Sequence, residues 1–134
     1  MTATATELTG TNVDEGESCD LTIVLYDATA VALVKASIIT LTVTLLDQLT
    51  GAVINSRNAQ DILDANGGAL ATDGTLVLRL QPLDNTNVNA TPVGEIEKHE
   101  VTIKWTWNDG VLVADRTGKH TFILRIAPLT TPVP

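Results

Sequence analysis

Residues 101–126 read VTIKWTWNDGVLVADRTGKHTFILRI, and this stretch decides the fold. Every second residue from Val101 to Trp107 is apolar, and a second alternating run follows from Thr121 to Ile126. A period of two is typical of a β-strand with one buried face. Asn, Asp and Gly residues between the runs favour turns. The stretch therefore predicts an antiparallel pair of strands, and the large rings on its inward face are the predicted core anchors: Trp105, Trp107 and Phe122.

Other segments show the same alternation, separated by turn residues. Residues 38–46 (IITLTVTLL) alternate aliphatic residues with threonine, and residues 19–26 and 75–81 are shorter runs of the same kind. Residues 58–65 break the pattern, with Asn58 as a possible cap, and predict one short helix. About seven to eight strands of this kind predict an all-β fold, a single antiparallel β-sandwich with extended termini.

The chain is long enough for one domain. We expect an acidic N-terminal arm at residues 1–16, the β-sandwich at residues 17–129 and a Pro-rich tail at residues 130–134. The arm is too polar to offset its own ordering entropy, so it is either disordered in isolation or ordered by docking on a neighbour. Residues 83–94 predict a long polar loop.

Composition argues against several classes of function. The net charge of −8 opposes non-specific binding to nucleic acid. No apolar run reaches the length of a membrane span, and the N-terminus lacks the basic and apolar regions of a secretory signal. The single cysteine, Cys19, excludes an internal disulfide. These features predict a soluble protein made in the cytoplasm, with neither a nucleic acid nor a membrane as partner.

The polar residues do not form a recognisable reactive constellation. His99 and His120 are expected to be exposed or half-buried polar residues, and one thiol is too few for a typical zinc site. Asp61, Asp64 and Asn66 offer oxygens, but their spacing does not fit a calcium loop and turn formation explains them. No serine or cysteine lies in a nucleophile motif. The sequence predicts no metal, no cofactor and no enzymatic activity.

Two surface patterns leave alternatives open. The threonines that alternate with the buried residues form either a plain solvent face or a flat packing face in an assembly. The charges are also uneven along the chain, which reflects either uneven solvation or contacts between the acidic end of one copy and the basic end of another. The candidate inter-subunit contacts are Glu7, Asp14, Glu15, Glu17, Arg116, Lys119 and Arg125.

A resemblance to a known group of proteins adds to this interpretation. The order LTVTLLDQLTGAVINSRNAQDILDANGGALATDGTLVLRLQPLDN, followed by EIEKHEVTIKWTWNDG and TGKHTFILRI, resembles small tailed-bacteriophage virion proteins with immunoglobulin-like domains. The resemblance extends from about residue 21 to residue 129, and its most specific pieces are Trp105-Thr106-Trp107 and residues 117–120. The pattern is similar to the N-terminal domain of phage upper-baseplate proteins. It implies a single immunoglobulin-like antiparallel β-sandwich and a structural role without catalytic residues.

The resemblance implies a non-enzymatic virion protein, made in the host cytoplasm, whose partners are other virion proteins such as the major capsid protein or neck and tail proteins. We expect a homo-oligomer or a lattice-bound copy. Capsid decoration or cementing is favoured, and a neck, tail or baseplate adaptor is the alternative. A further alternative is a carbohydrate-binding host-recognition module that uses residues 83–94, although the sequence offers no spare aromatic residue for sugar stacking.

Overall fold

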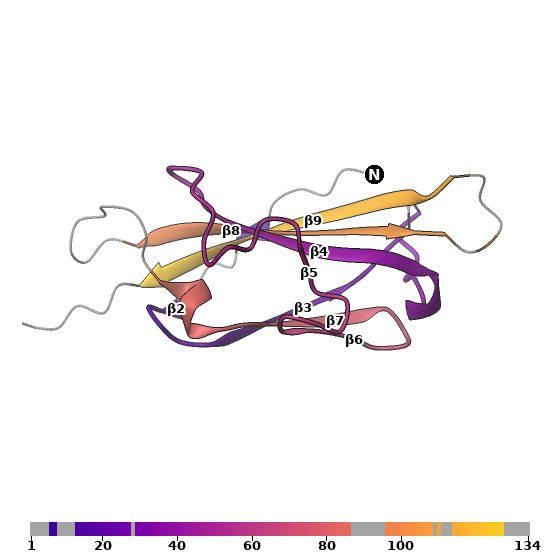
Figure 1. The fold of residues 1–134 in the computed structure, drawn as a ribbon, viewed down its shortest axis with the longest axis horizontal. Helices are drawn as coiled ribbons and strands as arrows, with labels where there is room; N and C mark the ends of the chain where they lie inside the picture. The colour runs from indigo at the N-terminus through magenta and orange to yellow at the C-terminus, as the bar shows by residue number, and fades with distance from the viewer. Residues whose placement is uncertain are drawn as a thin grey trace, which may run out of the picture.

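A computed structural model of the 134-residue chain describes residues 6–7, 13–27, 29–86, 96–108, 110 and 114–127. In these ranges the chain forms two β-sheets packed face to face (Figure 1). The larger sheet lies above the smaller one in that view, and both run along the long axis of the molecule. The helical content is limited to two short 3₁₀ turns, η1 (Lys35–Ser37) and η2 (Pro82–Asn85), in the part of the chain that is described.

The larger sheet is built on three long antiparallel strands: β4 (Ile38–Asp47), β8 (Glu97–Trp107) and β9 (Arg116–Ala127). The short strand β5 (Gln60–Asp61) pairs with β4 at one edge. At the other edge, β1 (Thr6–Glu7) and β2 (Val13–Asp14) run parallel to β9. The register places Val101 opposite Phe122, so the strand pair predicted from residues 101–126 is confirmed as β8 and β9.

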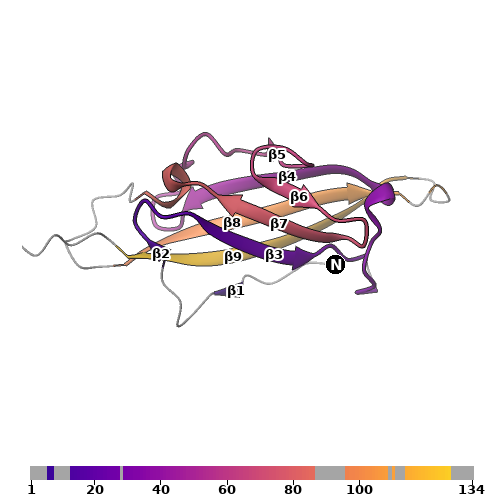
Figure 2. The ribbon, with the colours of Figure 1, turned by 90° about the horizontal axis from the view of Figure 1, so that it is seen from below.

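The smaller sheet contains β3 (Cys19–Val24), β7 (Thr75–Leu80) and β6 (Gly68–Leu70), all antiparallel. In Figure 2 it lies in front of the larger sheet. The pairings β3–β7–β6 and β5–β4–β8–β9 match strands B–E–D and C′–C–F–G of an immunoglobulin sandwich. The predicted fold class, an all-β immunoglobulin-like sandwich, is therefore confirmed.

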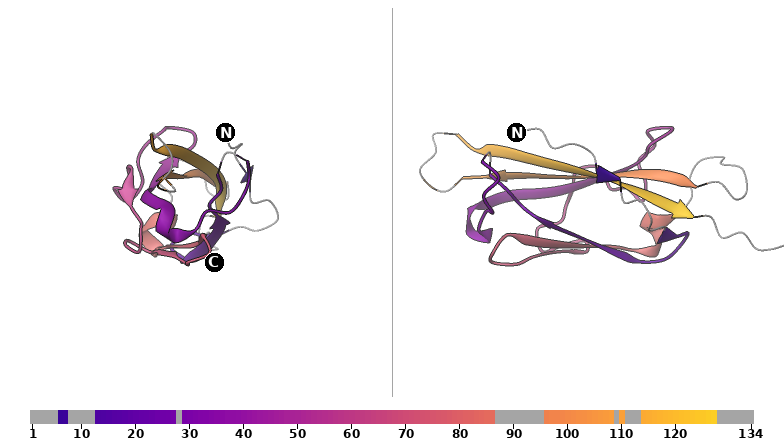
Figure 3. Two further views of the ribbon diagram at one scale, coloured as in Figure 1. Left: turned by 90° about the vertical axis from the view of Figure 1, so that its right-hand side faces the viewer. Right: turned by 180° about the vertical axis from the view of Figure 1, so that it is seen from behind.

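The core lies between the two sheets, which surround it when the molecule is viewed along its long axis (Figure 3). Aliphatic residues of both inner faces fill it, and Trp105 and Phe122 are buried among them. The indole nitrogen of Trp105 donates a hydrogen bond to the carbonyl of Tyr26 at 3.2 Å. Trp107 packs against the core but is only partly buried. Two of the three predicted anchors thus lie inside, and the third lies at the rim.

The predicted short helix at residues 58–65 is wrong. This segment contains β5 and a series of turns, and Ala59 and Asp64 have positive φ angles of 49° and 52°. Side-chain oxygens accept hydrogen bonds from two backbone N–H groups of the segment: Thr44 Oγ1 from the Ala59 N–H at 3.0 Å, and Asp61 Oδ1 from the Leu63 N–H at 2.9 Å. The second is a local bond of the kind that competes with helix formation, and the first ties the segment to β4.

Parts of the predicted N-terminal arm lie on the sandwich. The N–H of Glu15 donates to the carbonyl of Ala127, and the N–H of Gly16 donates to that of Asn85, each at 2.8 Å. The Pro-rich tail and residues 87–95 of the predicted polar loop lie outside the described residues. Among the residues described here, none belongs to a helix long and apolar enough to span a membrane.

Candidate functional site

The larger sheet has an outer face, which is the side turned away from the smaller sheet. We define the outer face by the non-core residues at its centre: Thr40, Thr42, Thr44, Thr102, Lys104, Thr106, Thr117, Lys119 and Thr121. Hydroxyl groups join neighbouring strands across it, with 2.6 Å between the Oγ1 atoms of Thr40 and Thr106 and 3.0 Å between those of Thr102 and Thr121. The predicted threonine rows therefore form a polar surface on which hydroxyl groups link neighbouring strands.

Basic side chains lie opposite each other on this side of the sheet. Lys104 on β8 is the direct neighbour of Lys119 on β9, and Lys98 is the direct neighbour of Arg125. Like charges at directly opposite positions destabilise a strand pair. Lys104 and Lys119 have no ion-pair partner among the residues that the structure describes. The outer face is thus locally basic, although the whole chain carries a charge of −8.

The edge of β9 adjoins the outer face. Its parallel pairing with the N-terminal segment consists of Thr6 with Phe122, Glu7 with Ile123, Val13 with Ile126 and Asp14 with Ala127. Within the described part of the chain, residues 116–121 have a strand partner on the β8 side only. An unpaired strand edge offers backbone donors and acceptors to another chain.

The structure places the predicted contact residues in two groups. Glu7, Asp14 and Glu15 lie along the half of β9 that contains Arg125, and Glu17 follows them in the turn before β3. Arg116 and Lys119 lie on the other half of β9, toward the opposite end of the sandwich. Acidic and basic residues are therefore brought together within one chain at one end of β9, but Arg116 and Lys119 remain apart from the acidic segment.

A buried ion pair lies at the β2 end of the sandwich. The guanidinium of Arg57 donates to both carboxylate oxygens of Asp84, at 2.6 Å through Nε and 3.0 Å through Nη2. Asp84 also accepts from the Asn55 side chain and from the Gln81 backbone N–H. The remaining Arg57 nitrogen donates to Gln60 Oε1 and to the Asn66 carbonyl. Because these contacts hold the residues around β5 against the η2 turn, the network serves the fold.

A second polar cluster is buried at the same end. Asp47 is the last residue of β4, and Glu97 and His99 begin β8, with Asp47 directly opposite His99. Their exposed fractions are 0%, 2% and 0%. Nε2 of His99 contacts the Glu97 carboxylate, and Asp47 accepts hydrogen bonds from the Thr50 backbone and hydroxyl. The expectation that His99 is exposed or half-buried is wrong, whereas His120 is indeed partly exposed.

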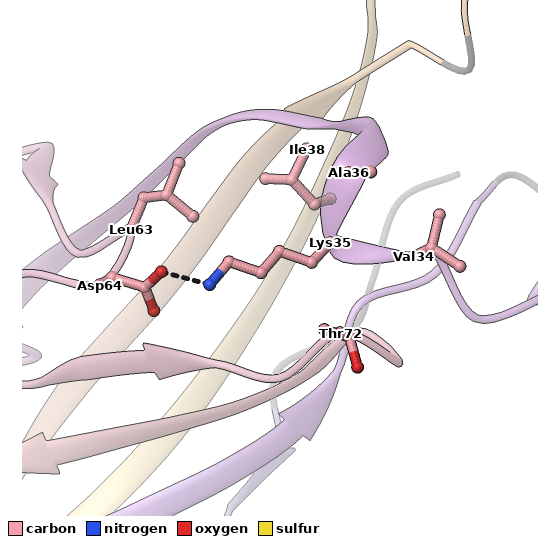
Figure 4. Close-up of a pocket in the computed structure, with 7 residues that line it drawn as sticks. All are labelled: Val34, Lys35, Ala36, Ile38, Leu63, Asp64 and Thr72. Atoms are coloured by element: carbon pink, nitrogen blue, oxygen red, sulfur yellow. Dashed lines mark hydrogen bonds and ion pairs between the residues drawn. The ribbon is translucent and has the colours of Figure 1, made fainter.

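The η1 end carries an open surface depression of about 560 Å³ (Figure 4). An ion pair between Lys35 and Asp64 crosses it, beside the apolar side chains of Val34, Ile38 and Leu63. The Leu70 N–H and then Lys35 lower the pKa of Asp64 below its usual range. The ion pair occupies the polar side of the depression, which otherwise offers a shallow apolar wall.

The other polar residues singled out in the sequence serve the fold. Asp61 and Asp64 accept backbone N–H groups, and the Asn66 side chain donates to the Asp61 carbonyl. Burial raises the pKa of the Cys19 thiol, a shift that the hydrogen bond from Asn85 opposes. A raised pKa makes the nucleophilic thiolate scarcer. These groups therefore give no indication of catalysis.

Asp47, Glu97 and His99 were missed as a group, although the sequence contains a signal for them. The inward positions of β4 are Leu41, Val43 and Leu45, and the next residue in that phase is Asp47. Reading the inward phase of β8 backward from Val101 reaches His99 and then Glu97. Continuing the period of two past the last apolar residue would have placed all three inside.

Comparisons of the chain with protein-family models, with curated protein sequences and with solved structures give no match.

Proposed function

We propose that the chain is a non-enzymatic structural protein of a tailed-phage virion that decorates or cements the capsid. Docking would use the outer face of the larger sheet together with the adjacent edge of β9. The observation that carries the proposal is the basic pair Lys104 and Lys119, placed side by side on an otherwise acidic protein. Two like charges at opposite positions weaken the isolated sheet, and an acidic partner surface lying against them would offset that cost.

The chemistry of the outer face supports a packing role. Threonine side chains lose little entropy on burial and can both donate and accept hydrogen bonds. The hydroxyl contacts of Thr40 with Thr106 and Thr102 with Thr121 hold four of them in fixed positions. A rigid face of this kind suits repeated docking on a symmetric shell, where many weak contacts together give tight attachment.

The resemblance to immunoglobulin-like virion proteins implies which partners this surface would contact: the major capsid protein or neck and tail proteins. A neck, tail or baseplate adaptor remains the alternative, because the same face could dock there. Nothing among the described residues favours the carbohydrate-binding alternative, since most of its predicted loop lies outside them.

Quantitative mass spectrometry of washed, purified particles tests the proposal. Hundreds of copies per particle, comparable with a symmetric shell, would support decoration, whereas roughly six to twelve copies would indicate a ring in the neck or tail. If the chain is absent from washed particles but abundant in the infected-cell lysate, the proposal of a virion protein is wrong.

A further inference from the structure

We propose that Asn66 is a site of spontaneous deamidation in the folded chain, with the backbone nitrogen of Gly67 as the attacking group. These two residues form the centre of an exposed turn before β6, which a 2.9 Å hydrogen bond from the Gly68 N–H to the Ala65 carbonyl closes. Both central residues have positive φ angles, 51° and 94°, as in a type I′ turn. Asn-Gly is a pair that such turns prefer, so the turn brings a reactive pair to the surface.

The reaction needs no partner other than water. The Gly67 nitrogen loses its proton to solvent and forms a bond to Cγ of Asn66, and the bond from Cγ to Nδ2 breaks as ammonia leaves. Water then opens the resulting five-membered succinimide ring at either of its two carbonyl carbons. Opening at Cγ gives aspartate, whereas opening at the former backbone carbonyl gives isoaspartate, in which the main chain runs through Cγ. Each product carries one more negative charge than asparagine.

The first support is the accessibility of the attacking nitrogen. In the part of the chain that the structure describes, the Gly67 N–H donates to no acceptor, so it can lose its proton without breaking a hydrogen bond. Glycine also has no Cβ atom to obstruct the approach to Cγ. The fold keeps glycine here, because a Cβ atom at residue 67 would lie 2.5 Å from the Arg79 carbonyl oxygen. The two reacting groups are therefore held within one uncrowded dipeptide.

The second support is a contact with Arg57. Nη1 of Arg57 donates to the Asn66 carbonyl at 3.0 Å. When the Gly67 nitrogen loses its proton, the negative charge spreads through the peptide group onto that oxygen, and the guanidinium beside it stabilises the charged form. The leaving nitrogen of Asn66 donates only to a neutral group, the Asp61 carbonyl, at 2.8 Å. The surroundings thus favour the nucleophile and hold the leaving group weakly.

A second turn with the same backbone conformation provides a comparison within the chain. Asn55 and Ser56 have φ angles of 52° and 57°, and a 3.1 Å backbone hydrogen bond closes their turn. There the attacking residue would carry a Cβ atom, and the Asn55 side chain donates to the buried Asp84 carboxylate at 2.8 Å. A charged acceptor holds an amide more firmly than a neutral carbonyl does. We therefore expect Asn66 to deamidate and Asn55 to persist.

Isoaspartate at residue 66 would alter the turn. The Gly67 carbonyl accepts a 2.8 Å hydrogen bond from the Arg79 N–H of β7, and the closing hydrogen bond fixes the residues on either side of the turn. A main chain lengthened by one carbon must displace either this contact with β7 or the carbonyl that Arg57 binds. We expect the isoaspartate form to unfold at a lower temperature than the Asn66→Asp variant, which carries the charge on an ordinary backbone.

The experiment incubates the full chain at about 37 °C between about pH 6 and pH 8 and follows each asparagine by peptide mapping and mass spectrometry. We expect aspartate and isoaspartate at residue 66, at a rate that rises about tenfold per pH unit because the nucleophile is the deprotonated nitrogen. Asn55 is the internal control and should be at least about tenfold less modified. The Asn66→Gln variant, whose longer side chain disfavours the five-membered ring, should not form these products at this position.

A synthetic peptide of residues 61–70 supplies the rate without the fold. The folded chain should react within about a hundredfold of the peptide, because a slower rate would mean that only its rare unfolded molecules react, which overturns the proposal. Aspartate without isoaspartate would overturn it too, since direct attack of water on the side-chain amide gives aspartate alone. Equal modification of Asn55 would overturn the part assigned to Gly67, and an isoaspartate form as stable as Asn66→Asp would overturn the predicted effect on the turn.

Discussion

At the scale of single residues, Arg57 is a charged residue in an almost completely buried position. It is 3% exposed and satisfies both oxygens of Asp84, which is itself fully buried. The Arg57 side chain also donates hydrogen bonds to Gln60 Oε1 and to the Asn66 carbonyl, so one guanidinium links the turns on both sides of β5. Removing one member of a buried ion pair leaves the other member charged and without compensation.

We therefore predict that Arg57→Ala lowers the free energy of unfolding by about 3–5 kcal/mol, the usual cost of breaking a buried pair. Urea denaturation followed by tryptophan fluorescence measures it. Arg79→Ala is the matched control, because Arg79 forms an exposed pair with Asp20 and its loss should change stability little. Equal effects of the two substitutions would show that the Arg57 network is not important for stability.

Gly118 lies against the Trp105 ring, and a second prediction follows from this contact. A Cβ atom at Gly118 would lie 2.3 Å from Nε1 of Trp105, closer than atoms can approach. Gly118→Ala should cost about 1–3 kcal/mol or more, because the ring or the strand must move. Thermal unfolding measures the cost, with Thr117→Ala at the adjacent exposed position as the control. Unchanged stability of Gly118→Ala would contradict the packing of Trp105 described above.

A third prediction concerns pH and His120. Partial burial lowers the pKa of His120 below its usual 6.5, and its ring packs edge-on against Phe122. The unfolded chain then binds a proton more readily than the folded one, so this residue's contribution to stability is present above pH 6.5 and is lost as the pH falls through the folded pKa. Unfolding curves between pH 7.5 and about 5 should show a decrease that His120→Gln reduces. An identical slope in the variant would contradict it.

Sequence reasoning worked well at residues whose position follows from strand period and less well elsewhere. Trp105 and Phe122 were placed correctly because alternation alone fixes their face. Arg57 and Asp84 could not be paired, because 27 positions separate them and each stands in an irregular segment. A charged residue in a loop is normally exposed, so only the three-dimensional structure shows this pair to be buried.

At the scale of elements, the edge of β9 is the strand edge that the N-terminal segment partly covers. The N-terminal segment covers part of it through β1 and β2, and Ile123, opposite Glu7, is buried although it lies outside the main core cluster. Parallel pairing over a few residues is a small contact compared with the eleven residue pairs between β8 and β9. We therefore expect that residues 1–12, which do not include β2, can be removed with little effect on the sandwich itself.

A fourth prediction is that deletion of residues 1–12 leaves a folded chain that self-associates through the uncovered edge. Exposed strand edges template pairing with other chains, and the deletion removes the partner of Ile123 while keeping β2. Sedimentation velocity over a range of concentrations would detect the association. Adding Ile123→Lys to the deletion should restore the monomer, since a charged edge opposes pairing. A deletion variant that stays monomeric at high concentration would contradict the prediction.

The one element that the sequence predicted incorrectly, the helix at residues 58–65, is decided by tertiary contacts. Residues 58–65 contain acid, amide and aliphatic residues in an order that a helix tolerates, yet tertiary hydrogen bonds decide their conformation. The Thr44 hydroxyl oxygen, on the neighbouring strand β4, accepts a hydrogen bond from the Ala59 N–H. The Arg57 guanidinium donates one to the Asn66 carbonyl. Neither partner can be recognised from the local sequence, so the pairing of β5 with β4 could not be predicted from it.

At the scale of the whole molecule, charges of both signs lie on each sheet. The larger sheet carries the basic pairs Lys104–Lys119 and Lys98–Arg125, but its strands also contain acidic residues such as Glu7, Asp14 and Glu100. An attachment that uses the basic pair Lys104 and Lys119 should weaken as salt screens the contact. The fold follows from strand period, but the identity of the partner does not follow from the charge pattern.

The most direct test of the proposed docking face is a charge reversal within it. Lys119→Glu would place opposite charges across β8 and β9, so stability should stay the same or rise slightly. The number of copies bound per particle is measured after the purified chain is added to particles assembled without it. We predict saturable binding of the original chain, a large loss for Lys119→Glu, and near-normal binding of Arg79→Glu, which makes the same charge change on β7. Full occupancy by Lys119→Glu would contradict the proposal that this face carries the attachment.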